Sequence, residues 1–394
     1  MNVHAPDCYN AEDLLVFGDI RKGVISQGIK VEVPDLQNLE AETIQALEDD
    51  FRTFLANLQE GERLQVQYYK GTDFDRKLER FRGITENSKA CRLSKRQRTE
   101  RYERYLVRMQ NDRLIQSELR FFLSAKVNDR TVGSFSRKSH YERIVRGYQQ
   151  SFQQRVQLGD GLLKGHGGSM AALDGLGHLR ELARYFGPAM AKRYLPEEIF
   201  SDPQMNLMQA VRAGSPQPLE GPDHGFYLDG HHFGILALAT LPKQTFMGMM
   251  GLFTGLAMPN LRMVVNCYPL SIEAEILKTE AAQEKLERST INKGGQQAKL
   301  RVKAGMERNE LRVRRLMTNQ VLPYKAQFIL IAYDPTKGGL RAKMATLKGV
   351  VGKLGGMRYY EPGWEVACLN YFNAAIPAAG RLIGTTITRT RSTT

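Results

Sequence analysis

The stretch Phe233–Leu241 is apolar at almost every position, and it constrains the fold more than any other part of the sequence. A short run of this kind, without polar alternation, predicts a strand that is buried on both faces. It follows Asp229-Gly230, a pair that favours a two-residue hairpin turn after Leu228. The sequence therefore predicts a sheet that is covered on both sides where this strand runs.

The same region carries His224, His231 and His232, which raises the question of a metal site. His231 and His232 are consecutive on the predicted strand, so their side chains point to opposite faces of the sheet. Asp229 could share a face with His231, and His224 could approach them, but the sequence offers no fourth ligand. We interpret the histidines as the solvent end of a core strand and predict no metal site.

The order of predicted elements indicates an α+β fold. In the first half, hydrophobic periodicity predicts a hairpin (residues 14–36), a helix (40–58), a strand (62–69), a polar helical segment (76–113) and another strand (117–127). The glycine-rich residues 158–177 are expected to break any continuous helix.

The second half repeats this theme. After the Asp229-Gly230 hairpin come a strand (residues 261–270) and a long charged helical stretch (271–317) that Ser271 can cap. A strand (325–334), a helix (339–354), a short strand (357–362) and a closing helix (364–375) follow. We predict two related lobes of mixed or antiparallel sheet, covered by helices and carrying long charged helical connectors. The first lobe, which includes a helical insertion, is predicted over residues 1–212, and the second lobe over residues 226–380. Residues 213–225 are predicted to be a Pro/Gly-rich linker between them.

The positive charge is confined to two segments. The chain has a formal net charge of +14, and residues 76–113 hold 13 Lys and Arg against 5 Asp and Glu, while residues 293–315 hold 8 against 2. Both segments are predicted helical connectors, one in each half. The residues expected to contact an anionic partner are Lys95, Arg96, Arg98, Arg101, Arg104, Arg108, Lys299, Arg301, Lys303, Arg312, Arg314 and Arg315.

The alternative for these segments is that they are solvated faces of long helices. Glu100 with Arg104 and Glu310 with Arg314 have the i,i+4 spacing that stabilises exposed helices. Aromatic residues among the basic ones are limited to Tyr102 and Tyr105, which is few for stacking on single-stranded nucleic acid. Both interpretations stay open at the level of sequence.

No motif predicts catalysis. Gly352-Lys353 is followed by Leu354 where a P-loop needs Ser or Thr, and Leu347 stands where its first glycine belongs. The chain has no G-x-S-x-G, and its four cysteines form no C-x-x-C. We therefore expect no catalytic, cofactor-binding or metal-binding residue in this chain.

The Met-rich segment Phe246–Pro259 falls short of the roughly 18 residues that a membrane span needs. One interpretation is a surface for a membrane subunit, because Met-rich apolar faces adapt to partners. Its candidate residues are Phe246, Met247, Met249, Met250 and Phe253. The alternative, which the apolar composition favours, is a buried core helix.

Residues 227–245, YLDGHHFGILALATLPKQT, resemble the central hairpin of the N-terminal domain in the large conjugative-transfer and type IV secretion ATPases, the TraC/TrbE class. Residues 63–69, the charged helical stretch 271–317, the strand 326–333 and the closing segment 363–381 occur in the order of that domain. The similarity is one of pattern and order over nearly the whole chain.

This resemblance implies a non-catalytic domain that docks the ATPase to the inner-membrane complex of a bacterium and assembles its homo-oligomer. The family's P-loop motor, with ATP and Mg, would lie downstream of Thr394, and residues 381–394 would be a linker towards it. The implied location is cytoplasmic and peripheral to the inner membrane, and the expected partners are inner-membrane secretion subunits, anionic lipid or DNA. The alternative function is nucleic-acid binding through helices 76–113 and 293–315. A third interpretation, a stand-alone metal-dependent enzyme, would rest on the histidines alone.

Overall fold

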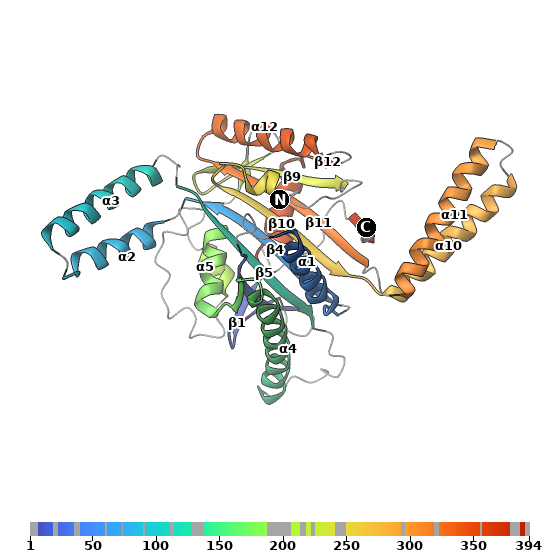
Figure 1. Cartoon of the computed structure of the whole chain (residues 1–394), viewed down its shortest axis with the longest axis horizontal. Coiled ribbons are helices and arrows are strands. Elements are labelled where there is room, and N and C mark those ends of the chain that lie inside the picture. The colour runs from blue at the N-terminus through green and yellow to red at the C-terminus, as the bar shows by residue number, and fades with distance from the viewer. Residues whose placement is uncertain are drawn as a thin grey trace.

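The computed structural model describes most of the chain (Figure 1). The described residues are 7–18, 23–34, 40–59, 61–72, 74–89, 91–110, 114–127, 138–186, 206–212, 218–221, 225–240, 250–292, 296–318, 323–354, 357–378 and 387–390.

The described residues of the first half form six strands and the helices between them. Its strands are β1 (Cys8–Ala11), β2 (Leu14–Phe17), β3 (Val24–Glu32), β4 (Glu62–Gly71), β5 (Gln116–Lys126) and β6 (Ser169–Ala172). Its helices, in the described residues, are α1 (Ala41–Ala56), α2 (Asp75–Glu86), α3 (Arg92–Gln110), α4 (Lys138–Lys164), α5 (Gly175–Tyr185) and α8 (Leu207–Arg212).

The second half supplies the remaining elements. Its strands are β7 (Leu219–Glu220), β8 (Phe226–Leu228), β9 (His231–Thr240), β10 (Leu261–Pro269), β11 (Pro323–Asp334), β12 (Arg358–Tyr360) and β13 (Ile387–Thr390). Its helices are α9 (Gly251–Thr254), α10 (Ile272–Asn292), α11 (Gln296–Met317), α12 (Lys337–Lys353), α13 (Trp364–Leu369) and the π-helix η2 (Asn370–Ala374).

All described strands join one sheet, in which every pairing is antiparallel. The strand order is β1-β2-β3-β5-β4-β10-β11-β9-β8-β7, with β6 beside β3, β12 beside β9 and β13 beside β11. β4 of the first half pairs with β10 of the second, so that Val66 lies opposite Val265. The α+β prediction is confirmed, but the sheet is continuous, and the two halves do not form separate lobes.

Helices cover both faces of the sheet, as the fully apolar strand required. On one face α1 and α4 pack against Leu64 and Phe121, while α9 and α12 pack against Leu236 and Leu330. On the other face α5, α8 and the segment from α13 to residue 378 pack against the side chains of alternate strand residues such as Phe233. Residues 233–238 are buried throughout, which confirms the predicted two-sided strand.

The predicted hairpin turn is confirmed. Leu228 pairs with His231 across Asp229 and Gly230, which have φ angles of 48° and 80°. Two successive positive φ values are those of a type I′ turn, the form whose twist matches that of the flanking strands. Ser271 also caps α10 as expected, since its Oγ accepts a hydrogen bond from the Ala274 N–H at 3.3 Å.

The glycine-rich segment interrupts the helix as predicted, but only after Lys164. α4 continues through Gly159 and Gly161 as far as Lys164, and β6 and α5 follow it. Gly159 faces Phe54 and Met170, and an added Cβ would lie 2.5 Å from the Met170 sulfur. Close packing on α1 and β6 therefore uses the small residue and offsets the low helix propensity of glycine.

Candidate functional site

Two helical arms project from the sheet, and they contain the two basic segments. The first arm, α2 with α3, connects β4 to β5, and the second arm, α10 with α11, connects β10 to β11. Because β4 and β10 are antiparallel neighbours, their C-terminal ends lie at opposite ends of the sheet. Figure 1 shows the arms pointing away from the body in opposite directions.

The first arm is held together by a small apolar seam. The ring of Phe81 on α2 meets that of Tyr105 on α3 edge to face, with centroids 6.4 Å apart, and Leu78 and Thr85 are buried. Most other side chains of this arm are exposed or half-buried. The seam is narrow, which explains why the sequence of this segment looks almost entirely polar.

The second arm is fixed at its base by a buried carboxylate. Glu275 on α10 is 5% exposed and accepts hydrogen bonds from Arg312 of α11 at 2.7 Å and from Lys278 at 3.1 Å. Further along, Gly305 of α11 lies against Leu286 of α10, where an added Cβ would be 3.1 Å from the leucine. These contacts hold the two helices side by side as one antiparallel hairpin.

The basic residues predicted on α3 divide into two groups. Lys95, Arg96 and Arg98 have partners within the arm: the Glu86 carbonyl, Glu100 and Ser88. Glu100 thus pairs with Arg96 and not with Arg104. Among the described residues, no ion pair involves the exposed side chains of a stripe on α3, which we call the α3 stripe: Arg101, Arg104 and Arg108.

The basic residues predicted on α11 are more dispersed. Lys299, Lys303 and Arg314 are exposed, Arg315 is half-buried, and the side chain of Arg301 lies outside the described residues. Arg312 is engaged with Glu275, so its charge is partly neutralised inside the arm. The structure therefore does not gather these residues into one surface.

Both arms expose large apolar side chains. Twelve large hydrophobic side chains are exposed in the described part of the chain, and seven of them lie on the arm helices: Ile84, Leu93, Val107, Leu277, Leu300, Leu311 and Met317. Isolated exposed hydrophobic residues are normal on proteins, but their concentration on projecting elements is typical of contact surfaces.

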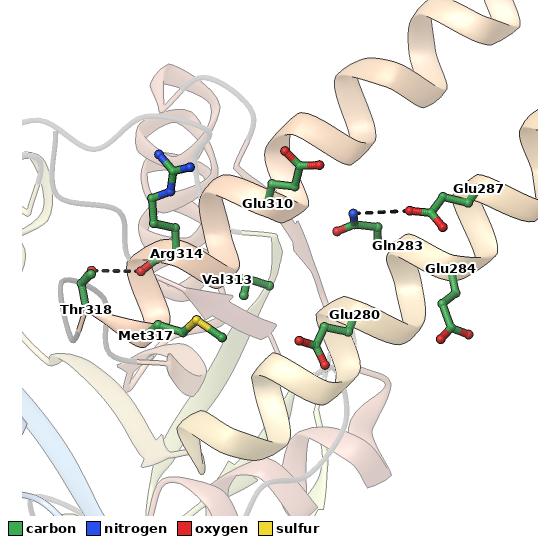
Figure 2. Close-up of a pocket in the computed structure, with 9 residues that line it drawn as sticks. All are labelled: Glu280, Gln283, Glu284, Glu287, Glu310, Val313, Arg314, Met317 and Thr318. Atoms are coloured by element: carbon green, nitrogen blue, oxygen red, sulfur yellow. Dashed lines mark hydrogen bonds between the residues drawn. The ribbon is translucent and has the colours of Figure 1, made fainter.

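A groove runs between α10 and α11 (Figure 2). Its volume is about 670 Å³, and four acidic side chains from both helices line it around the apolar Val313 and Met317. One basic side chain, Arg314, and the polar Gln283 and Thr318 complete the lining. The acidic residues are Glu280, Glu284, Glu287 and Glu310. A chain of strongly positive net charge therefore carries one locally acidic surface, which charge counting along the sequence did not reveal because α11 is basic.

The Met-rich segment is only partly described. Phe246, Met247 and Met249 lie outside the described residues. Phe253 is fully buried in the core that α9 and α12 form on the sheet, in contact with Phe328 at a ring separation of 6.2 Å. Met250 is half-buried on the wall of a groove of about 800 Å³ that opens over β3, β4, β5 and β10. Phe253 thus has the environment of the core-helix alternative.

The histidine-rich hairpin has no arrangement of ligands in the described residues. The ring of His231 contacts Tyr333 and that of His232 contacts Tyr227, while His224 lies outside the described residues. No group of three His, Cys, Asp or Glu side chains capable of holding a metal ion occurs in the described part of the chain. Gly352-Lys353 lies at the C-terminal end of α12, far from the strand-to-helix loop that a nucleotide site uses.

A buried charged cluster was not predicted from the sequence. Arg262 on β10 is 4% exposed, and its guanidinium lies 4.8 Å from the Tyr69 ring centroid and 4.9 Å from that of Tyr185. Nearby, Glu181 of α5 pairs with Arg120 of β5 at 3.0 Å and Arg184 at 3.5 Å.

The cluster keeps its acid ionised. Burial alone would raise the pKa of Glu181, but attraction from Arg184, Arg120 and Arg262 holds it below its ordinary value. The residues come from β4, β5, β10 and α5, segments far apart in the chain. No spacing rule joins such residues, and the arrangement fits a structural junction between the halves and α5.

No described helix is both long and apolar enough to cross a lipid bilayer. No protein-family model matches the chain, and no curated protein matches it either.

Proposed function

We propose that the chain is a docking and assembly domain of the type IV secretion and conjugation ATPase class. One observation carries the proposal: the sheet carries two opposed helical arms with exposed basic and apolar side chains. A domain of this shape presents surfaces to partners at both of its ends. The order of elements that the resemblance rests on supports the same assignment.

The proposal includes a duplication of one unit within the chain. The first half runs β3, α1, β4, arm, β5, α4, β6, and the second runs β9, α9, β10, arm, β11, α12, β12. In each half the third long strand lies between the first two, and a short strand returns to the first: β6 beside β3, and β12 beside β9. Two related halves explain why both arms leave the sheet at equivalent points.

The proposed partners are inner-membrane secretion subunits and further copies of the chain, with anionic lipid headgroups as a secondary contact. The proposed location is cytoplasmic, at the inner membrane of a bacterium. The α3 stripe supports this role, because its three arginines are exposed and form no ion pair within the described part of the chain, so that they are available to acidic groups of a partner. Hydrolysis would belong to a separate motor domain.

The test compares two sets of inverted inner-membrane vesicles, from cells with and without the genes of a conjugative secretion system. We expect the chain to co-float with the first set and at least tenfold less with the second. The variant R101E/R104E/R108E should lose this preference. The control K337E/K353E/R358E changes the net charge equally at exposed positions on α12 and β12 and should behave as wild type. Equal flotation with both vesicle sets would contradict the proposal.

The second candidate function is nucleic-acid binding through the same stripe. Arg101, Arg104 and Arg108 follow one side of α3, as phosphate-contacting residues do. If all three arginines contact a DNA duplex, the logarithm of the binding constant falls linearly as the logarithm of the salt concentration rises. The variant R101E/R104E/R108E should reduce the steepness of this dependence by about 3 × 0.9. Binding that is tight at physiological salt and needs no secretion subunit would favour this function over docking.

A further inference from the structure

The groove between α10 and α11 has an excess of acidic side chains, because four glutamates and a single arginine, Arg314, line it. Within the described residues, Glu280 and Glu310 form no ion pair, and Glu284 has only a 3.6 Å contact with Arg288. Figure 2 shows the glutamates on the two facing helices, with Val313 and Met317 between them. Met317 is 64% exposed, so the groove has an apolar floor open to solvent.

The spacing of these acids matches that of the α3 stripe. Glu280, Glu284 and Glu287 stand at i, i+4 and i+7 on α10, and Arg101, Arg104 and Arg108 stand at i, i+3 and i+7 on α3. Each set therefore spans about 10 Å along one side of its helix. The methylene groups of arginine can also cover apolar residues such as Val313 and Met317 while the guanidinium reaches a carboxylate.

The two surfaces cannot meet within one molecule. The arm that carries the stripe and the arm that forms the groove lie on opposite sides of the body (Figure 1). A contact between them must join different molecules, and it uses different surfaces on each. Such a heterologous contact produces a ring if the rotation closes and an open chain if it does not.

We propose that the α3 stripe of one copy docks into the α10–α11 groove of a second copy. This deepens the proposed function, on which it rests, by naming the surfaces through which the domain assembles. Because both surfaces are exposed and charged, the contact strengthens at low ionic strength and weakens as salt is added.

The experiment measures the mass of the full chain by sedimentation velocity over a concentration series at low salt. Wild type should form species larger than one chain. R101E/R104E/R108E and E280K/E284K/E287K should each associate at least tenfold more weakly, because like charges then face each other. All six substitutions in one chain restore opposite charges with the roles exchanged, so this variant should assemble again.

Each outcome bears on the inference. A monomeric wild type, or a six-substitution chain that stays monomeric while circular dichroism shows unchanged helix content, would overturn it. K337E/K353E/R358E should assemble like wild type, and its failure to do so would mean that net charge, not this contact, drives association.

Failure of this inference and failure of the proposed function give different results. E280K/E284K/E287K keeps the α3 stripe, so as a single chain it should still float with vesicles that hold secretion subunits. Flotation without charge-swap assembly would reject only the inference. Charge-swap assembly without flotation would reject only membrane docking.

Discussion

At the scale of residues, the structure depends on buried polar groups with specific partners. His178 on α5 is fully buried, and its Nε2 accepts a hydrogen bond from the Gly28 N–H of β3 at 2.7 Å. Gly28 is required there, since an added Cβ would lie 2.8 Å from the same nitrogen. The neutral ring therefore carries its proton on Nδ1, which has no partner in the described structure.

Burial lowers the pKa of His178 to about 4, although Asp13, Asp174 and Glu181 attract its proton. The unfolded value is about 6.5. Between these two values the unfolded chain binds more protons than the folded one, so stability falls as pH drops from about 6.5 to 4.

We expect the free energy of unfolding to fall by at most about 1.4 kcal/mol per pH unit in this window. The fall should be smaller in His178→Gln, because the glutamine does not titrate and its amide oxygen can still accept the hydrogen bond from Gly28. The measurement is the free energy of unfolding by urea at half-unit steps from pH 7 to 4. If the curves of wild type and variant run parallel across this window, His178 is not the responsible group.

At the scale of elements, each arm is a helical hairpin stabilised mainly by its own contacts. The second arm depends on Glu275, which joins α10 to α11 through Arg312. Because the arms project beyond the sheet, their opening should be local and should not require the core to unfold.

We therefore expect Glu275→Gln to loosen the second arm by about 1–3 kcal/mol, since it leaves the half-buried Arg312 without its charged partner. Amide hydrogen exchange should accelerate in α10 and α11, with the midpoint of global urea unfolding nearly unchanged. Glu273→Gln is the matched control, an exposed acid in the same first turn, and should have little effect. Faster exchange throughout the sheet would show that the arm is part of the global folding unit.

At the scale of the whole molecule, one segment connects both halves. From the last residue of η2, the backbone of residues 374–378 crosses the sheet and forms hydrogen bonds with side chains of four strands. The Ala374 carbonyl accepts hydrogen bonds from Gln65 of β4 and Asn266 of β10. The Ala378 carbonyl accepts hydrogen bonds from Ser26 of β3 and Ser124 of β5. The Ala378 N–H in turn donates to Gln65. These bonds satisfy backbone groups that the segment buries.

Gln65 has the largest role in this row, because it also donates to Asn266 and accepts from Gln67. Replacing Gln65 by Met keeps the volume but leaves several buried groups without partners, so we expect a loss of about 2–4 kcal/mol in unfolding free energy. Gln45→Met, on the exposed side of α1, should cost less than about 0.5 kcal/mol. Chemical denaturation of the two variants decides this, and equal stabilities would show that the polar row contributes nothing net.

Local signals were sufficient for much of the fold. The two-sided strand Phe233–Leu238, the Asp229-Gly230 turn, the Ser271 cap and the helical nature of both basic segments follow from periodicity, turn chemistry and capping, all of which act over a few residues. The glycine-rich residues 158–177 interrupt the helix as predicted, but the exact end of α4 at Lys164 did not follow from local signals. Gly159 stays inside the helix because it packs against Phe54 and Met170, which lie on segments distant in sequence.

By itself, the sequence determined the element types, their order and the confinement of positive charge to two helical segments. The tertiary structure alone decided that the halves share one sheet, that the arms point in opposite directions, and that the acidic groove and the α3 stripe lie on different arms. It also decided that Arg262 is sandwiched between Tyr69 and Tyr185. The physical reason is that strand pairing and side-chain burial join residues hundreds of positions apart, whereas propensity and periodicity report only on neighbours along the chain.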